Sequence, residues 1–118
     1  MAERTVLEES PNLPALFARA AVSARGRGGD LPGARLARVG VTADPAQLAD
    51  YGRVCGFSLA DTLPVTFPHL LAFPLQVALM TDPAFPLALP GLVHVRNRIS
   101  VLRPVGAAEP LDLSLIHI

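Results

Sequence analysis

The sequence predicts an α+β fold in which an antiparallel sheet surrounds a central apolar helix. Three patterns carry this prediction. Residues 45–55 are bounded by helix-capping residues, residues at about 70–80 are apolar on every side of a helical wheel, and residues 93–103 alternate between apolar and polar side chains. A helix that is apolar all round has to be enclosed, and a strand with one apolar face can supply part of the cover.

The composition is that of one folded domain with an excess of apolar surface. The chain has 118 residues, of which 51% are hydrophobic and only 17% are charged. Ten basic and ten acidic residues balance, so the chain lacks the basic stripe of a nucleic-acid-binding protein. All the basic residues are arginine, which together with abundant Ala, Gly and Pro indicates a GC-rich, bacterial gene. The apolar excess indicates surface that meets a partner or further chain.

The cysteine content and the first residues predict a cytoplasmic protein. Cys55 is the single cysteine, which excludes an internal disulfide and a cysteine-based zinc site. Glu3, Glu8 and Glu9 stand where a signal peptide would be basic. The apolar stretch Leu70–Met80 is too short to span a bilayer, so we expect no membrane partner.

The N-terminal third is predicted to begin with a flexible lead-in over residues 1–34. Within it, Leu13–Val22 is predicted to form a helical turn or two, and the glycine-rich run Arg25–Asp30 lacks Walker spacing and is interpreted as a linker. Residues 35–42 contain β-branched valines and predict a first strand.

Residues 45–55 have the strongest local signals in the chain. Asp44 is a predicted N-cap, Pro45 occupies the first helical position, and Gln47 completes a capping-box pattern. Gly56 is the predicted stop. The apolar stripe of this helix consists of Leu48, Tyr51 and Cys55, and Cys55 is expected to be a packed core thiol.

Three further elements follow. The apolar helix at about 70–80 is predicted to hold Pro74 in or near its first turn, where a missing N–H costs least. Residues 93–103 are predicted to be a strand, and Leu111–Ile118 would begin the next one. The predicted buried face of the first of these strands consists of Val93, Val95, Asn97, Ile99 and Val101.

Four tracts resemble the N-terminal half of bacterial double hot-dog MaoC-like dehydratases. They are Tyr51–Phe57 (YGRVCGF), Leu63–Leu75 (LPVTFPHLLAFPL), Met80–Asp82 (MTD) and Gly91–His94 (GLVH). Their order and spacing extend the resemblance over residues 35–112. A sheet wrapped round a central helix is the hot-dog architecture, so the resemblance implies a partial N-terminal hot-dog domain over 35–112, and hence an incomplete hot-dog fold.

The family implies reversible hydration of trans-2-enoyl thioesters, as in R-specific enoyl-CoA hydratases of fatty acid metabolism, which are lyases. Its catalytic tract is of the type Gly-Asp-x-Asn-Pro-x-His and lies in the C-terminal half. Asp112 and His117 have the same five-residue spacing, but Leu113–Ile116 contains no Asn-Pro and Leu111 replaces the glycine. We interpret the pair as coincidence and predict no catalytic residue in this chain.

The last six residues predict a non-native tail. Leu113–Ile118 (LSLIHI) can be encoded by CTG TCT CTT ATA CAC ATC, which matches the mosaic-end adapter of transposase-based sequencing libraries. Two of the three isoleucines fall in the last three residues, and an ATA codon is unusual in a GC-rich gene. We therefore expect residues 113–118 to be adapter-encoded and the reading frame to be truncated; the alternative is a genuine short protein with a hydrophobic C-terminal strand.

The substrate-binding residues implied by the resemblance are Phe73, Val77, Met80 and His69. The first three, together with Phe67, would line an acyl tunnel, with plain core packing as the alternative. His69 would lie near that tunnel or at the subunit seam, with a hydrogen bond to the helix start or a neighbouring strand as the alternative.

His94 alternates with Arg96 and Arg98, and two interpretations of these residues stay open. Together they would contact a coenzyme A phosphate, because arginine suits phosphate, or they would form a solvated strand face. The three histidines of the chain are scattered without ligand spacing, so we expect no metal site and no cofactor.

Three hypotheses follow for function. The first is the acyl-binding and structural half of an enoyl-thioester hydratase, not itself catalytic, whose partners are an acyl thioester of coenzyme A or acyl carrier protein, a missing C-terminal hot-dog half, and further copies in a homo-oligomer. The second is a non-catalytic acyl-binding or scaffolding hot-dog module. The third is an unrelated small α+β interaction domain.

Overall fold

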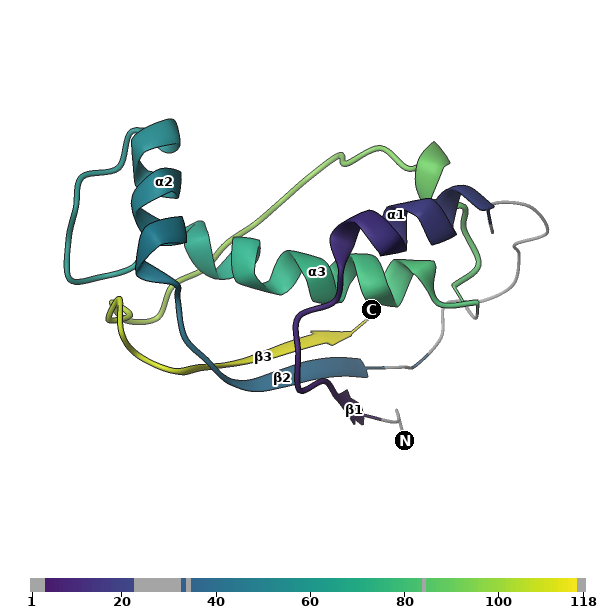
Figure 1. Cartoon of the computed structure of the whole chain (residues 1–118), viewed down its shortest axis with the longest axis horizontal. Helices are drawn as coiled ribbons and strands as arrows, with labels where there is room; N and C mark the ends of the chain where they lie inside the picture. Colours follow the sequence, from purple (N-terminus) through teal and green to yellow (C-terminus); the bar gives the residue numbers. More distant parts are fainter. Residues whose placement is uncertain (1–3, 23–32, 34, 84, 117–118) are drawn as a thin grey trace.

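The computed structural model describes residues 4–22, 33, 35–83 and 85–116. Within them the chain is α+β, with three α-helices packed beside a small three-stranded sheet (Figure 1). In chain order the elements are β1 (Arg4–Val6), α1 (Leu13–Val22), β2 (Arg35–Val41), α2 (Pro45–Cys55), α3 (Phe67–Thr81), the short 3-10 helix η1 (Leu89–Gly91) and β3 (Leu111–Ile116). This arrangement is compatible with a partial hot-dog fold.

The sheet is mixed, which corrects the prediction of an antiparallel one. The strand order is β1-β2-β3, with β1 parallel to β2 and β3 antiparallel to it. A parallel pair needs a long crossover between its strands, and α1 supplies it. The strand predicted at 35–42 is confirmed as β2, which is the central strand.

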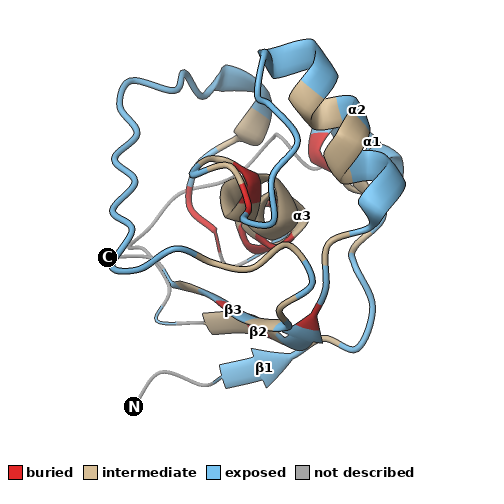
Figure 2. Ribbon diagram, turned by 90° about the vertical axis from the view of Figure 1, so that its left-hand side faces the viewer, coloured by how far each residue is buried: buried red, intermediate tan, exposed pale blue. Residues whose placement is uncertain are grey.

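The longest helix is α3, which matches the apolar helix expected at about 70–80 and extends it at the N-terminal end. All fifteen of its residues are buried or half-buried. Viewed along α3, the sheet lies on one side and α1 and α2 on another (Figure 2). The three described strands therefore do not wrap the helix, and its enclosure by a sheet stays a prediction.

The core lies between α3 and the sheet. Leu75 of α3 meets Val41 of β2 and Leu113 of β3, and all three side chains are buried. Half-buried leucines complete this cluster, namely Leu7, Leu36, Leu71, Leu111 and Leu115. The segment predicted to be adapter-encoded thus contributes Leu113 to the core of the structure.

Pro74 is in the interior of α3, not in its first turn as predicted, because the helix begins at Phe67. Here proline removes the N–H that would donate to the Leu70 carbonyl, at a cost of about 3 kcal/mol. The burial of the surrounding apolar side chains is what keeps the helix continuous through this residue.

The strand predicted at 93–103 is absent, and this prediction was wrong. Residues 92–101 pass beside α3 without pairing to any described strand, and every residue from 91 to 104 is exposed (Figure 1). Val93 and Val95, expected on the buried face, have exposed fractions of 82% and 90%. Alternating side chains make a strand only where a neighbouring strand supplies hydrogen bonds, and β2 already has β1 and β3 on its two edges.

The segment expected to be a flexible lead-in contains two described elements. β1 pairs with β2, and Leu13–Val22 forms a ten-residue helix instead of a turn or two. Its Ala20 is buried beside α3. The predicted linker Arg25–Asp30 lies outside the described residues.

Candidate functional site

An open cavity of about 670 Å³ lies along one face of α3. Phe17 of α1 and the consecutive residues 92–97 form its other walls. Phe67, also predicted at the acyl tunnel, is fully buried and does not line this cavity. The predicted substrate-binding residues His69, Phe73, Val77 and Met80 do line it. They share one face of α3 because their spacings of four, four and three residues follow the helical repeat.

The cavity is apolar along its length and has polar groups at a few points. Val77 is buried, while His69, Phe73 and Met80 are half-buried. The rings of His69 and Phe73 are tilted against each other, with centroids 6.3 Å apart. Apolar walls with a few polar groups are typical of sites that hold a small molecule with an apolar portion.

A second cavity of about 320 Å³ continues toward α2 and shares His69, Phe73 and Asn97 with the first. Tyr51 and Thr66 also line it, and their hydroxyl groups are hydrogen-bonded to each other. The two cavities therefore meet at His69 and Asn97, whose side chains add hydrogen-bonding groups to the apolar walls.

Sequence reasoning missed Tyr51, Thr66 and Asn97 as lining residues. Tyr51 was assigned to an apolar stripe, and its ring does pack edge-on against Phe67, with centroids 5.3 Å apart. Asn97 gave a usable signal, because it is the polar residue on the otherwise apolar face predicted for residues 93–101.

His94 and Arg96 line the larger cavity from the 92–97 side. His94 Nε2 lies 2.9 Å from the Arg96 backbone carbonyl oxygen. Since a carbonyl can only accept, Nε2 carries the proton and donates it. This contact holds the imidazole beside the Arg96 backbone, at the mouth of an apolar space.

The Asp112 side chain accepts a hydrogen bond of 2.9 Å from the Gly40 backbone N–H. Gly40 has a positive φ of 67°, and it lies where the β2–β3 register shifts between Arg38 and Val41. The Asp112 side chain therefore stabilises the irregular pairing of β2 with β3 at this point. The Asp112–His117 pair itself lies partly outside the described residues, because His117 is not among them.

Cys55 is exposed at the end of α2, so the prediction of a packed core thiol was wrong. No residue of α2 is fully buried, because the helix stands at one end of α3 (Figure 1). Leu48 and Tyr51 are half-buried, whereas Val54 and Cys55 face outward.

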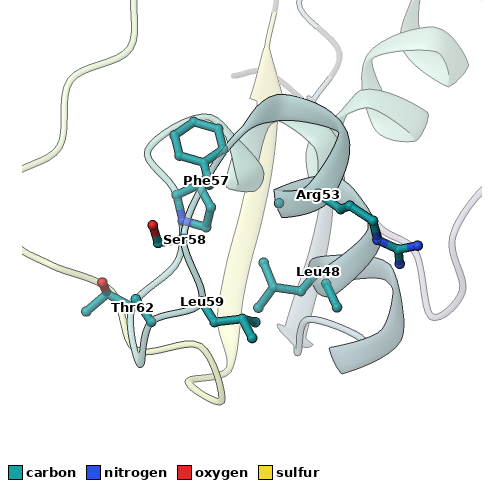
Figure 3. A pocket seen from close by; sticks show the side chains of 10 residues that line it. Leu48, Arg53, Phe57, Ser58, Leu59 and Thr62 are labelled. Carbon is teal, nitrogen blue, oxygen red and sulfur yellow. The ribbon is translucent and has the colours of Figure 1, made fainter.

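A further cavity of about 270 Å³ lies between α2 and the loop that follows it (Figure 3). Leu48 and Leu59 point toward each other across it, whereas the guanidinium of Arg53 points away and pairs with Asp50. No predicted substrate-binding residue lines this cavity.

The described residues also bear on a metal site and on a membrane-spanning helix. Among the described residues, no three His, Cys, Asp or Glu side chains gather as a metal ion would require. None of the described helices has both the length and the hydropathy needed to cross a membrane.

Comparison with known proteins gives one informative similarity. The chain is 34% identical over 70 residues to 3-hydroxyacyl-thioester dehydratase X of Mycobacterium tuberculosis. The match covers 59% of this chain but only 25% of that protein. No family model matches the chain, and no solved structure matches it. The similarity supports a relationship to a 3-hydroxyacyl-thioester dehydratase.

Proposed function

We propose that this chain is the acyl-binding and structural half of an enoyl-thioester hydratase or dehydratase of the MaoC-like family. In this proposal residues 35–112 form a partial hot-dog domain that holds the acyl chain along α3. A second hot-dog half supplies the catalytic Asp and His. This chain alone is not catalytic, because its sequence has no Asp and His at the family's spacing apart from the Asp112–His117 pair, which we interpret as coincidence.

The observation that carries the proposal is the convergence of four side chains on one cavity. The resemblance implies His69, Phe73, Val77 and Met80 as substrate-binding residues, and the same four residues line a space of about 670 Å³. The similarity to a thioester dehydratase points to the same class of ligand. Apolar walls suit an acyl chain, because each buried methylene contributes about 0.8 kcal/mol.

The exposed apolar side chains support the proposal that a partner covers part of this chain. Val93, Val95 and Leu102 have exposed fractions of 82%, 90% and 99%, and all lie on the segment predicted to be a strand. A second hot-dog half, or a second copy in a homo-oligomer, would cover such a surface. We keep the cytoplasmic location as part of the proposal, since acyl thioesters of coenzyme A are used there.

Binding of a neutral thioester, octanoyl-pantetheine, tests the acyl site. We expect the purified chain to bind it by calorimetry. Met80→Trp fills the cavity and should weaken binding about tenfold or more, a change of roughly 1.4 kcal/mol. Val54→Trp is the matched control, because Val54 is 85% exposed on α2 and away from the cavity. Absence of binding by the unmodified chain, or equal effects of the two variants, would contradict the proposal.

A non-catalytic acyl-binding or scaffolding module is the second candidate. The pairing of β3 with β2 favours it, because residues 111–116 fit the sheet and bury Leu113. The source locus should be resequenced by a method that uses no transposase. The first candidate expects different residues after Asp112 and a downstream Gly-Asp-x-Asn-Pro-x-His tract. Recovery of LSLIHI followed by a stop codon would favour the module instead.

A further inference from the structure

The 92–103 segment has a backbone that is free to pair with a strand. Its side chains alternate as in a strand, and no proline interrupts it between Pro90 and Pro104. Within the described part of the chain, no backbone N–H from Val93 to Arg103 donates a hydrogen bond to another backbone group. The segment therefore has the sequence of a strand and lacks only a neighbouring strand.

The β3 strand has the complementary deficiency, a free edge. It pairs with β2 on one side, and no described strand lies on its other side. Its residues Leu111, Leu113 and Leu115 contact the core, so Asp112 and Ser114 lie on the opposite face of the sheet. The strand contains no proline, and a free edge of this kind is a template for a further strand.

Within one chain the segment and β3 do not meet. Both Ile99–Arg103 and Leu111–Leu113 line a cavity of about 340 Å³, so open space lies between them. The connection that follows the segment is tied to the loop after α2, because the Leu63 N–H donates a 2.8 Å hydrogen bond to the Val105 carbonyl. The edge of β3 therefore stays available to another chain.

The charges on the segment favour β3 as its partner over a second copy of the segment itself. Arg96 and Arg98 lie on its polar face, and neither forms an ion pair within the described residues. Antiparallel pairing of two segments about Asn97 would place Arg96 opposite Arg98 of the second copy, and like charges directly opposite destabilise a sheet. The polar face of β3 carries the Asp112 carboxylate and no cation.

We propose that the 92–103 segment of one copy pairs with the free edge of β3 in a second copy, and that the second copy's segment pairs with β3 of the first. Such a reciprocal contact has two-fold symmetry and closes at a dimer. The valines of the segment then continue the leucine face of β3, while its arginines lie beside Asp112. The pairing does not depend on the acyl cavity. It uses backbone groups and concerns the 118-residue chain, whatever the origin of residues 113–116.

Sedimentation of the purified chain tests the assembly. We expect a monomer–dimer equilibrium without larger species. A double variant, Ser100→Pro with Val101→Pro, should weaken the dimer about tenfold or more. Consecutive N–H groups of a strand point to opposite edges, so one of the two that are lost faces the partner strand. Leu59→Pro with Ala60→Pro is the matched control, because both residues are exposed on the loop after α2.

Crosslinking identifies which strands meet. In a Cys55→Ser background, one chain carries Ser100→Cys and another carries Ser114→Cys, both at exposed positions. A short bis-maleimide added to the mixture should link position 100 of one chain to position 114 of the other. Each chain carries a single thiol, so every link joins two copies. A dimer that gives only 100–100 links or only 114–114 links would overturn the proposed pairing.

Two further outcomes would also overturn the proposal, and neither bears on the acyl site. A chain that stays monomeric with rapid amide exchange at 92–101 would leave the segment to a different polypeptide, such as a second hot-dog half. A monomer in which these amides are protected would show that the segment pairs with β3 of its own chain. Growth beyond the dimer would show that the contact is not reciprocal.

Discussion

Asp44 fixes the start of α2 through a contact that involves only neighbouring residues. Its side chain accepts a 3.0 Å hydrogen bond from the Ala46 backbone N–H, and Pro45 occupies the first helical position. At the other end Gly56 has a φ of 79°, a left-handed conformation that favours glycine. Because these contacts are local, the bounds of this helix follow from its sequence.

Removal of this cap should weaken the fold measurably. Asp44→Ala is expected to lower the free energy of unfolding by about 1 kcal/mol, since it leaves a helix N–H without its partner. Chemical denaturation followed by circular dichroism measures the change. Asp50→Ala is the control on the same helix, because its exposed pair with Arg53 is expected to contribute under about 0.5 kcal/mol. Equal losses in the two variants would contradict the capping role.

Folding clearly lowers the pKa of the Glu109 carboxylate. The hydrogen bond from Arg103 is the largest cause, followed by the 3.1 Å bond from the Gly106 backbone N–H, and together they lower the Glu109 pKa to about 2 from 4.5. The folded chain thus holds this carboxylate deprotonated where the unfolded chain would protonate it.

The sign of the pH dependence follows from this lowered pKa. Glu109 contributes stability above pH 4.5, and that contribution is lost as the pH falls toward about 2. Glu109→Gln should therefore flatten the loss of stability with acid over this window, and Arg103→Gln should do so in part. The effect is small because the pair is exposed to solvent. Melting temperatures at a series of pH values measure it; parallel curves for all three proteins would contradict the assignment.

Among the elements, the 92–103 segment is the one whose sequence and structure disagree. It has the alternation of a strand, yet no described strand pairs with it. β3 has β2 on one edge and no described strand on the other. Unpaired edges and exposed apolar side chains favour association between chains.

Hydrogen exchange measures whether this segment lacks a partner. Backbone amides at 92–101 should exchange rapidly in dilute protein, since no described strand pairs with them, while those of β2 should be protected. At higher concentration we expect the chain to associate and the 92–101 amides to become slower. Val95→Arg should reduce association, with Val54→Arg on α2 as the control. A monomer with protected 92–101 amides and cooperative unfolding would contradict this expectation.

At the scale of the whole molecule, the chain has a cavity along α3 that we propose to hold an acyl chain, and its sequence contains no Gly-Asp-x-Asn-Pro-x-His tract of the family it resembles. The one pair with the correct spacing includes Asp112, whose carboxylate is engaged by the Gly40 N–H. Binding an acyl chain does not by itself activate water, for which a positioned acid and base are needed.

We therefore expect no hydration of enoyl thioesters by this chain alone. Crotonyl-coenzyme A and a longer enoyl thioester should turn over at the buffer rate in a spectrophotometric assay. Addition of a second hot-dog half that carries the Asp and His tract should restore turnover. Activity of the chain alone that is abolished by Asp112→Asn, or by a substitution within 35–112, would show that the catalytic residues are already present.

By itself the sequence determined the elements that depend on local contacts. The caps at Asp44 and Gly56, the β-branched residues of β2 and the apolar run of α3 predicted those elements close to where they lie. Three of the residues expected to bind substrate, Phe73, Val77 and Met80, also share one face of the predicted helix by their spacing. His69 was expected before that helix, and only the structure places it on the same face.

Only the tertiary structure decided which elements meet. Strand pairing depends on residues far apart in the chain, so the parallel β1–β2 pair and the unpaired 92–103 segment could not be read from periodicity. Burial depends on what packs opposite a side chain, and no described element covers α2 at Cys55, which is exposed. The cavity itself arises because residues 92–97 pass beside α3, a juxtaposition that no local pattern encodes.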